Sequence, residues 1–290
     1  MPSLQHLRRK IGAITNTQKI TKAMKMVAAA KLKRAQARIL AARPYAHKMR
    51  NVLANLSRRV NRASHPLLQK RAGEVLEVVV VTSDRGLCGA FNANILRKAT
   101  EFLQGCEARR ARVTVSLVGR KGRDYFRRRH WPIRHQWTDV FDRLSYEHGL
   151  DIGQDLTQQF TKGTFDEAYV IYNEFKSAIQ QRVVVEKLFP LEAPDEDGEP
   201  SSLMGGSYEY EPDEDVLLHA LLPKHFQVQM FRILLESSAA EQGARMAAMD
   251  GATRNAGELI KKLTLYYNKT RQAAITKELM DIVGGVEALK

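Results

Sequence analysis

Residues 4–40 read LQHLRRKIGAITNTQKITKAMKMVAAAKLKRAQARIL, a stretch in which apolar residues recur at spacings of three and four. This period places them on one face of an α-helix. The pattern continues to about Val60, interrupted only at Pro44, and predicts one long N-terminal helix. A second tract of the same kind, from Pro223 to about Val283, predicts another long helix near the C-terminus.

These two helices are too long to be covered by a small domain. A helix of roughly 60 residues is about 90 Å long, so its apolar stripe needs another partner. We therefore predict that residues 1–62 and 216–290 pair as an antiparallel coiled coil. The residue numbers of facing positions should add to roughly 270–285, which leaves a short C-terminal stretch beyond Met1 as a lone helix.

Small residues dominate both tracts. Buried alanine contributes less to stability than buried leucine, and glycine inside a helix costs about 1 kcal/mol relative to alanine. We expect Ala28 and Ala247 to lie on the seam of the coiled coil. Other small residues fall outside any single stripe and would leave a low-profile apolar surface exposed. We infer that the helix pair normally sits inside another structure.

The middle of the chain has the pattern of an α/β domain. Residues 75–82 (VLEVVVVT) form a continuous apolar run, typical of a strand buried on both faces of a parallel sheet. Further strands are predicted at 112–118, 167–173 and 180–188, alternating with helices at 90–103, 121–129 and 145–161. The predicted fold class is thus α/β: a long antiparallel coiled coil of the terminal helices and a small doubly wound, Rossmann-like domain. An antiparallel strand at its last edge is left open. The domain should span 74–190, followed by an acidic linker at 191–215.

Charge is distributed unevenly along the chain. The net charge is +14, yet residues 1–73 hold 18 Lys and Arg without one acid, whereas 192–215 hold 10 acids without one base. The basic arm could be a solvated face, a surface for an acidic protein, or a nucleic-acid surface. Its one Phe, Tyr or Trp residue is Tyr45, and its heptads need a partner helix, which disfavours nucleic acid.

Neither a membrane span nor a disulfide framework is predicted. No apolar run approaches 18 residues, and the first ten residues lack the apolar core of a signal peptide. We therefore expect a cytosolic protein without direct insertion into a membrane. Cys88 and Cys106, the two cysteines of the chain, are expected to be free thiols.

The sequence SDRGLCG at 83–89 lies between a predicted strand and a predicted helix, where phosphate loops are found. It matches neither GxxxxGK[ST] nor GxGxxG, so tight turn geometry is the favoured use of its glycines. We find no catalytic constellation and expect no catalytic residue, no cofactor and no metal site. A structural or mechanical part is the simplest interpretation. Two rivals remain: a nucleic-acid-binding coiled coil, and a nucleotide-using α/β enzyme with phosphate at this loop.

Four stretches together resemble the gamma subunit of bacterial F-type ATP synthases. They are NTQKITKAMKMVAA at 16–29, SDRGLCG at 83–89, ARMAAM at 244–249 and YNKTRQAAITKEL at 267–279. They occur in the order found in the family and extend over nearly the whole chain.

The resemblance implies a non-catalytic rotor. The terminal helices would stand in the bore of the alpha/beta hexamer, and rotation would couple proton flow through the membrane ring to ATP synthesis. The α/β domain would be the foot, near the epsilon subunit and the c-ring. The complex would lie peripherally on the cytoplasmic face of the inner membrane, without nucleic acid.

The resemblance also implies seven coupling residues that contact the hexamer. Met24 and Lys25 match the position that faces an acidic lever of the beta subunit, and Arg245 lies on the opposing helix. The upper contacts with the catalytic ring match Arg271, Gln272, Thr276 and Glu278.

Overall fold

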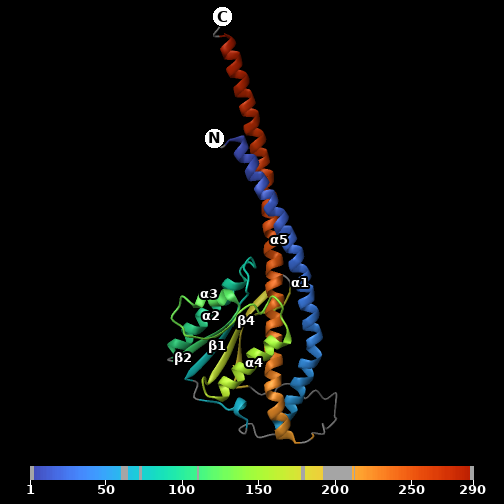
Figure 1. The fold of residues 1–290 in the computed structure, drawn as a ribbon, viewed down its shortest axis with the longest axis vertical. Helices are drawn as coiled ribbons and strands as arrows, with labels where there is room; N and C mark the ends of the chain where they lie inside the picture. The colour runs from blue at the N-terminus through green and yellow to red at the C-terminus, as the bar shows by residue number, and fades with distance from the viewer. Residues whose placement is uncertain are drawn as a thin grey trace. The chain divides into compact units, whose positions relative to one another are not determined.

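The computed structural model describes residues 3–59, 65–71, 74–109, 111–177, 180–191, 211 and 213–287. Its elements (Figure 1) are α1 (Leu4–Arg59), η2 (Pro66–Leu68), β1 (Val75–Val81), α2 (Phe91–Ala108), β2 (Arg112–Val118), α3 (Arg120–Phe126), β3 (Ile133–Trp137), α4 (Tyr146–Thr161), β4 (Glu167–Phe175), β5 (Gln181–Phe189) and α5 (Glu214–Glu287).

The chain divides into two compact units. Unit 1 comprises Met1–Ala29 and Arg245–Lys290, and unit 2 comprises Ala30–Ala244. Both α1 and α5 contribute to each unit.

A five-stranded sheet forms the centre of unit 2. Its strand order is β3-β2-β1-β4-β5; the first four strands are parallel, and β5 pairs antiparallel with β4. The apolar run that predicted a buried strand is the middle strand β1, in which Val78–Val81 are fully buried. The α/β fold class is confirmed, and the alternative of an antiparallel strand at the last edge is the correct one.

Helices cover both faces of this sheet (Figure 1). Leu76, Val78 and Val80 belong to the core formed with α2 and α3, whereas Val79 and Val81 belong to the core formed with α4 and the unit 2 parts of α1 and α5. The alternation follows from the period of two in a strand. The base of the helix pair is therefore part of the domain's own hydrophobic core.

The contact between α4 and α5 is closed by two glycines. An alanine methyl at Gly149 would lie 2.7 Å from Cβ of Phe231, and one at Gly153 would lie 3.0 Å from Cα of Gln227. A side chain at either position would push the helices apart, so the glycines fix their close approach.

Two charge networks are built into unit 2. Glu77, which has no exposed surface, accepts a hydrogen bond from Nε of Arg134 at 3.0 Å, and Arg134 also pairs with Asp155 at 2.7 Å. In the second network, Arg232 bridges Glu186 and Glu236 at 3.0 and 3.1 Å. Removal of one partner from such a buried network strands the remaining charge.

Several element boundaries differ from the sequence-based expectation. Strand β3 was not predicted, because Arg134, His135 and Gln136 interrupt any apolar alternation; the strand pairs only with β2. Helix α3 ends at Phe126, three residues before the expected end, and the chain enters β3 at Ile133.

The two long helices tolerate proline. Helix α1 passes through Pro44, and α5 begins at Glu214, nine residues before Pro223. Burial of Leu218 and Leu222 against the core favours this additional helical segment, although proline removes one backbone hydrogen bond. Most of the expected linker, residues 192–210 and 212, lies outside the described residues.

Candidate functional site

The helix pair of unit 1 is joined by a seam with polar contacts. Oγ1 of Thr253 donates to Oγ1 of Thr21 at 2.8 Å, and Nε2 of Gln18 donates to the Thr253 carbonyl at 3.4 Å. Nζ of Lys25 lies 2.5 Å from Oδ1 of Asp250. The residue numbers of these pairs add to 271–275. The predicted antiparallel pairing and its register are confirmed for unit 1.

One seam position was predicted wrongly. Ala28 is buried, but Ala247 is exposed. Seam positions on α5 follow spacings of three and four through Met246, Met249 and Thr253, so Ala247 falls outside the stripe. The seam in unit 1 is accordingly less rich in alanine than the sequence suggested.

Met24 and Lys25 lie at the edge of this seam. Both residues are half-buried, and the side chains of Lys25 and Asp250 retain 44% and 36% exposure. The hydrogen bond from Lys25 lowers the pKa of Asp250, and the nearby charge of Arg254 acts in the same direction. The ammonium expected to face an acidic partner already has a carboxylate beside it within the chain. Arg245 is half-buried on α5.

The other four predicted contact residues lie farther along α5. Arg271, Gln272, Thr276 and Glu278 are all exposed, and the Thr276 hydroxyl donates to the Gln272 carbonyl at 3.0 Å. At 1.5 Å per residue, Arg271 is roughly 30 Å from Asp250 along the helix. The seven residues thus form two separate groups in unit 1, one near Lys25 and one near the C-terminal end.

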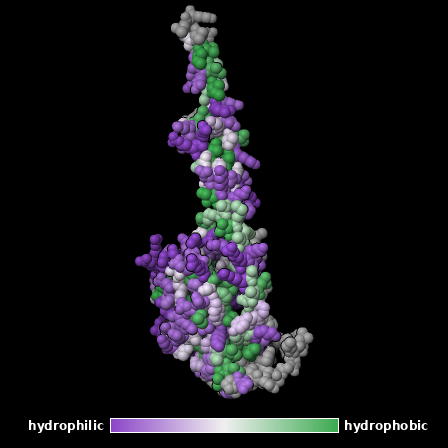
Figure 2. All heavy atoms as spheres, turned by 45° about the vertical axis from the view of Figure 1, so that its right-hand side comes forward, coloured by the Kyte–Doolittle hydropathy of each residue, from purple (hydrophilic) through white to green (hydrophobic). Residues whose placement is uncertain are grey.

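The C-terminal group lies on a single helix. In unit 1, α5 extends beyond the N-terminal end of α1, as Figure 1 shows. Polar and apolar residues are mixed on its surface (Figure 2). The exposed apolar residues of this segment are Ile275, Leu279, Met280, Ile282 and Val283.

The 83–89 loop of unit 2 is held by its own contacts. Asp84 accepts hydrogen bonds from the backbone N–H groups of Arg120, Asp139 and Phe141 at 3.1, 2.9 and 3.2 Å. Its carboxylate therefore ties the loop to the start of α3 and to the segment after β3. Gly89 has φ +58°, which confirms the predicted turn role for that glycine.

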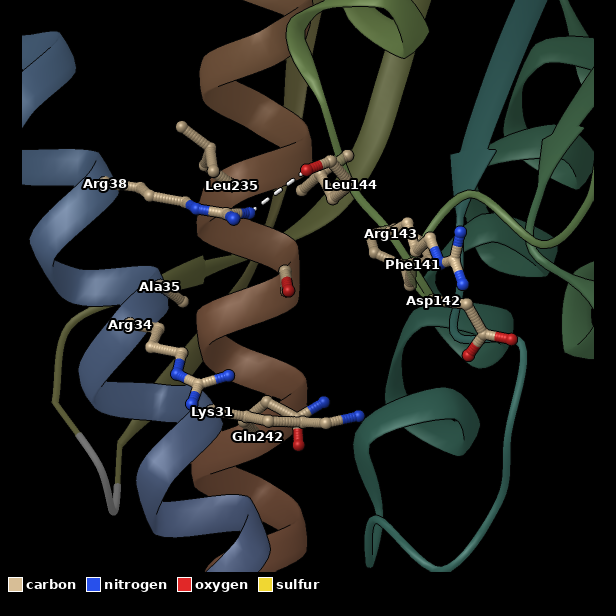
Figure 3. Close-up of a pocket in the computed structure, with 11 residues that line it drawn as sticks. Lys31, Arg34, Ala35, Arg38, Phe141, Asp142, Arg143, Leu144, Leu235 and Gln242 are labelled. Atoms are coloured by element: carbon tan, nitrogen blue, oxygen red, sulfur yellow. Dashed lines mark hydrogen bonds between the residues drawn. The ribbon is translucent and has the colours of Figure 1, made fainter.

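A basic pocket in unit 2 was not singled out from the sequence. The pocket encloses about 300 Å³ between α1, α5 and residues 141–144 (Figure 3). Lys31, Arg34 and Arg38 line it from α1, and Arg143 lines it from the other side. Their spacing on α1 could have indicated a basic helix face. Arg143, more than 100 residues away, could not have been assigned to it.

Comparison with known proteins shows the family. The ATP synthase family model matches residues 3–289. The chain is 50% identical over 293 residues to the ATP synthase gamma chain of Anaeromyxobacter sp. (strain Fw109-5), and 46% identical over 290 residues to that of Geobacter metallireducens (strain ATCC 53774 / DSM 7210 / GS-15). Each alignment covers 100% of both chains. The chain belongs to the ATP synthase gamma chain family. The resemblance inferred from the four stretches is confirmed.

Solved structures show the same fold. A chain of the Tetrahymena thermophila mitochondrial ATP synthase central stalk/c-ring matches with a TM-score of 0.61 and 26% identity, over 80% of this chain and 99% of that one. A chain of the Euglena gracilis OSCP/F1/c-ring structure matches with a TM-score of 0.68 and 21% identity, over 99% and 94%.

The stretches that carry the family resemblance lie on the helices of unit 1 and in the loop that follows strand β1 of unit 2. Residues 16–29 and 267–279 are on the helices of unit 1, and 83–89 follow the central strand of unit 2. None of the three interactions between α1 and α5 described above involves the C-terminal stretch at 267–279, whose polar residues Arg271 and Gln272 are exposed. Its side chains are therefore available to another protein.

Proposed function

We propose that the chain is the rotating central shaft of an F-type ATP synthase. In this role it couples proton flow through a membrane ring to ATP synthesis in an alpha/beta hexamer, without catalysing a reaction itself. The observation that carries the proposal is 50% identity to an ATP synthase gamma chain over the full length of both sequences.

The non-catalytic role is supported by the 83–89 loop, the place where a nucleotide-using enzyme would hold phosphate. The Asp84 carboxylate in this loop accepts hydrogen bonds from three backbone N–H groups outside it, and the Ser83 hydroxyl donates to Oδ1 of Asn92 at 3.1 Å. A carboxylate in this loop repels a phosphate group. ATP binding and hydrolysis are thus assigned to the hexamer.

The seven coupling residues are proposed to touch the hexamer in two zones. Met24, Lys25 and Arg245 form the lower zone, and the exposed group from Arg271 to Glu278 forms the upper zone. Exposed ion pairs contribute only about 0–1 kcal/mol each, so such contacts can be exchanged during rotation. At the lower zone, an acidic lever of the beta subunit would share the Lys25 ammonium with Asp250.

The α/β domain, residues 74–190, is proposed to be the foot, in contact with the epsilon subunit and the c-ring. The acidic linker would end before Glu214, where the second long helix α5 begins. Among the described helices, none is both long and apolar enough to cross a bilayer. We place the complex peripherally on the cytoplasmic face of the inner membrane, held there through the c-ring.

Reconstitution tests the function directly. Purified alpha and beta subunits are mixed with the chain, and complex formation and ATPase activity are measured together with the rotation of a bead attached to unit 2. We expect a stable complex with ATPase activity and unidirectional rotation, and no ATPase activity from the chain alone. Absence of a complex would contradict the shaft role.

Two further experiments test the rival functions, nucleic-acid binding and nucleotide-dependent catalysis. Tight, steeply salt-dependent binding of generic duplex DNA would favour a nucleic-acid-binding coiled coil. ATP turnover by the isolated chain that is lost in Asp84→Ala would favour an enzyme using the 83–89 loop. We expect neither result.

A further inference from the structure

We propose that the basic pocket of unit 2 binds a phosphate chain, that of a free nucleoside polyphosphate or of inorganic polyphosphate. The pocket lies in the space between α1, α5 and residues 141–144, and none of the seven coupling residues lines it. Its occupation would tie these three parts of unit 2 together.

The side chains that line the pocket are mostly hydrogen-bond donors (Figure 3). Lys31 and Arg34 contribute charged groups, the Arg143 guanidinium lies on the far side beside Asp142, and Gln242 and Ser238 of α5 add an amide and a hydroxyl. Arginine guanidinium groups match phosphate oxygens in a two-point geometry, and lysine provides a compact charge. The lining therefore favours a ligand with many acceptor oxygens and several negative charges.

The charge of the pocket is largely uncompensated. In the described part of the chain, no ion pair joins Lys31, Arg34 or Arg143 to a carboxylate. The one acid in the lining, Asp142, is 3.0 Å from Nη2 of Arg85. Like charges that line one pocket repel each other, and a polyanion would relieve that repulsion.

Arg38 has a different role. Its Nη1 donates to the Leu144 carbonyl at 3.0 Å, which joins α1 to the 141–144 segment across the pocket (Figure 3). This hydrogen bond holds the 141–144 wall of the pocket against α1. The pocket is thus organised before a ligand arrives, which reduces the entropy lost on binding.

The size of the pocket favours a small anion over a protein segment. A volume of about 300 Å³ is at the lower end of small-molecule sites, whereas a stable protein interface buries at least about 1,200 Å². Walls on three sides suit a short chain of phosphates. The ring of Phe141 at the edge could also contact a nucleotide base.

Calorimetric titration of the full chain tests the site. The probes are tripolyphosphate, ATP, ADP and orthophosphate, in low salt with EDTA to remove divalent cations. We expect one saturable site for tripolyphosphate and ATP and weaker binding of orthophosphate. Equal affinity for tripolyphosphate and ATP would assign recognition to the phosphates alone, whereas tighter ATP binding would add a contact with the base.

Two matched double variants locate the site. Lys31→Gln with Arg34→Gln removes two pocket cations, and Lys33→Gln with Arg128→Gln removes two exposed cations outside the pocket. Loss of a hydrogen bond to a charged group weakens binding by about tenfold or more, so the pocket variant should lose at least that factor. The control should change the dissociation constant by less than about twofold. Melting curves without ligand verify that both variants fold.

Three results would overturn the proposal. They are no saturable binding of tripolyphosphate or ATP, equal weakening in the two double variants, and tighter binding of a glutamate-rich decapeptide than of tripolyphosphate. The second would indicate attraction by the overall positive charge, and the third a docking surface for an acidic protein. ATPase activity of a reconstituted complex is independent of all three results.

Discussion

Gly149 on α4 leaves no space for even a methyl group against α5. An added Cβ would lie 2.7 Å from Cβ and 2.9 Å from Cα of Phe231. We predict that Gly149→Ala destabilises unit 2 by about 1–2 kcal/mol, because overpacking costs about 1–3 kcal/mol and alanine recovers up to about 1 kcal/mol of helix propensity. Urea unfolding measures the change.

The matched control is Gly105→Ala in α2. Apart from the neighbouring residues and the backbone of the helix itself, no atom lies within 4 Å of the added methyl there, so alanine should be neutral or stabilising by up to about 1 kcal/mol. Equal stability changes for the two variants would show that α4 and α5 do not approach as closely as the structure indicates.

His65 makes unit 2 sensitive to acid. It is 4% exposed, and its Nδ1 accepts a hydrogen bond from the backbone N–H of Leu67 at 3.1 Å. Burial, and then the charge of His219, lower the pKa of His65 to about 4 from 6.5. Because the pKa is lowered in the folded state, the stabilisation is complete above pH 6.5 and is lost as the pH falls toward 4.

We predict a loss of roughly 2 kcal/mol from this residue between pH 7 and pH 5. His65→Asn keeps a cap for η2 but has no titratable ring. The variant should therefore lose less stability than the wild-type protein over this range in urea unfolding experiments. Identical pH profiles for both proteins would rule out His65 as the origin of the acid sensitivity.

At the scale of elements, the seam in unit 1 can be tested by cross-linking. The hydroxyl oxygens of Thr21 and Thr253 are 2.8 Å apart, so cysteines in both positions should oxidise rapidly to an internal disulfide. We expect no comparable rate for cysteines at Thr21 and Arg254, because Arg254 is exposed and turned about 100° around the helix. Faster cross-linking of the second pair would contradict the register.

The sequence was sufficient for elements with a strong period. The valines of β1 and the heptads of α1 and α5 are buried or paired as their spacing indicated. Short segments in which polar and apolar residues do not alternate could not be predicted from their spacing. Strand β3 exists because β2 offers a free edge and because Arg134 reaches the buried Glu77. Both reasons lie outside its own five residues.

The candidate sites also differ in how far they could be predicted from the sequence. The seven coupling residues came from a resemblance, and their contacts with other subunits remain predictions. The basic pocket depends on residues 141–144 lying near Lys31 and Arg34, which only the folded chain shows. The aspartate in the 83–89 loop was visible in the sequence, but its three backbone partners were not.

At the scale of the whole molecule, coupling can be separated from folding. Gln272 is exposed on the lone part of α5, and surface substitutions usually change stability by no more than about 0.5 kcal/mol. We predict that Gln272→Ala leaves the unfolding of the free chain unchanged but lowers ATP-driven proton pumping relative to ATP hydrolysis in reconstituted vesicles. Lys262→Ala, at an exposed polar residue of α5 outside the upper zone, is the control. Unchanged pumping with a destabilised chain would make Gln272 a structural residue.

The polar seam of unit 1 also bears on how a helix pair resists sliding. Leucines on a seam can exchange partners after a shift of one heptad at little cost. The Thr21–Thr253 and Gln18–Thr253 hydrogen bonds are tied to one alignment, as polar seam residues commonly are in coiled coils. A shift would leave these groups and the Lys25–Asp250 pair without their partners. The polar contacts would therefore keep α1 and α5 of unit 1 in one alignment when torque acts on the shaft, even though few large side chains hold the two helices together.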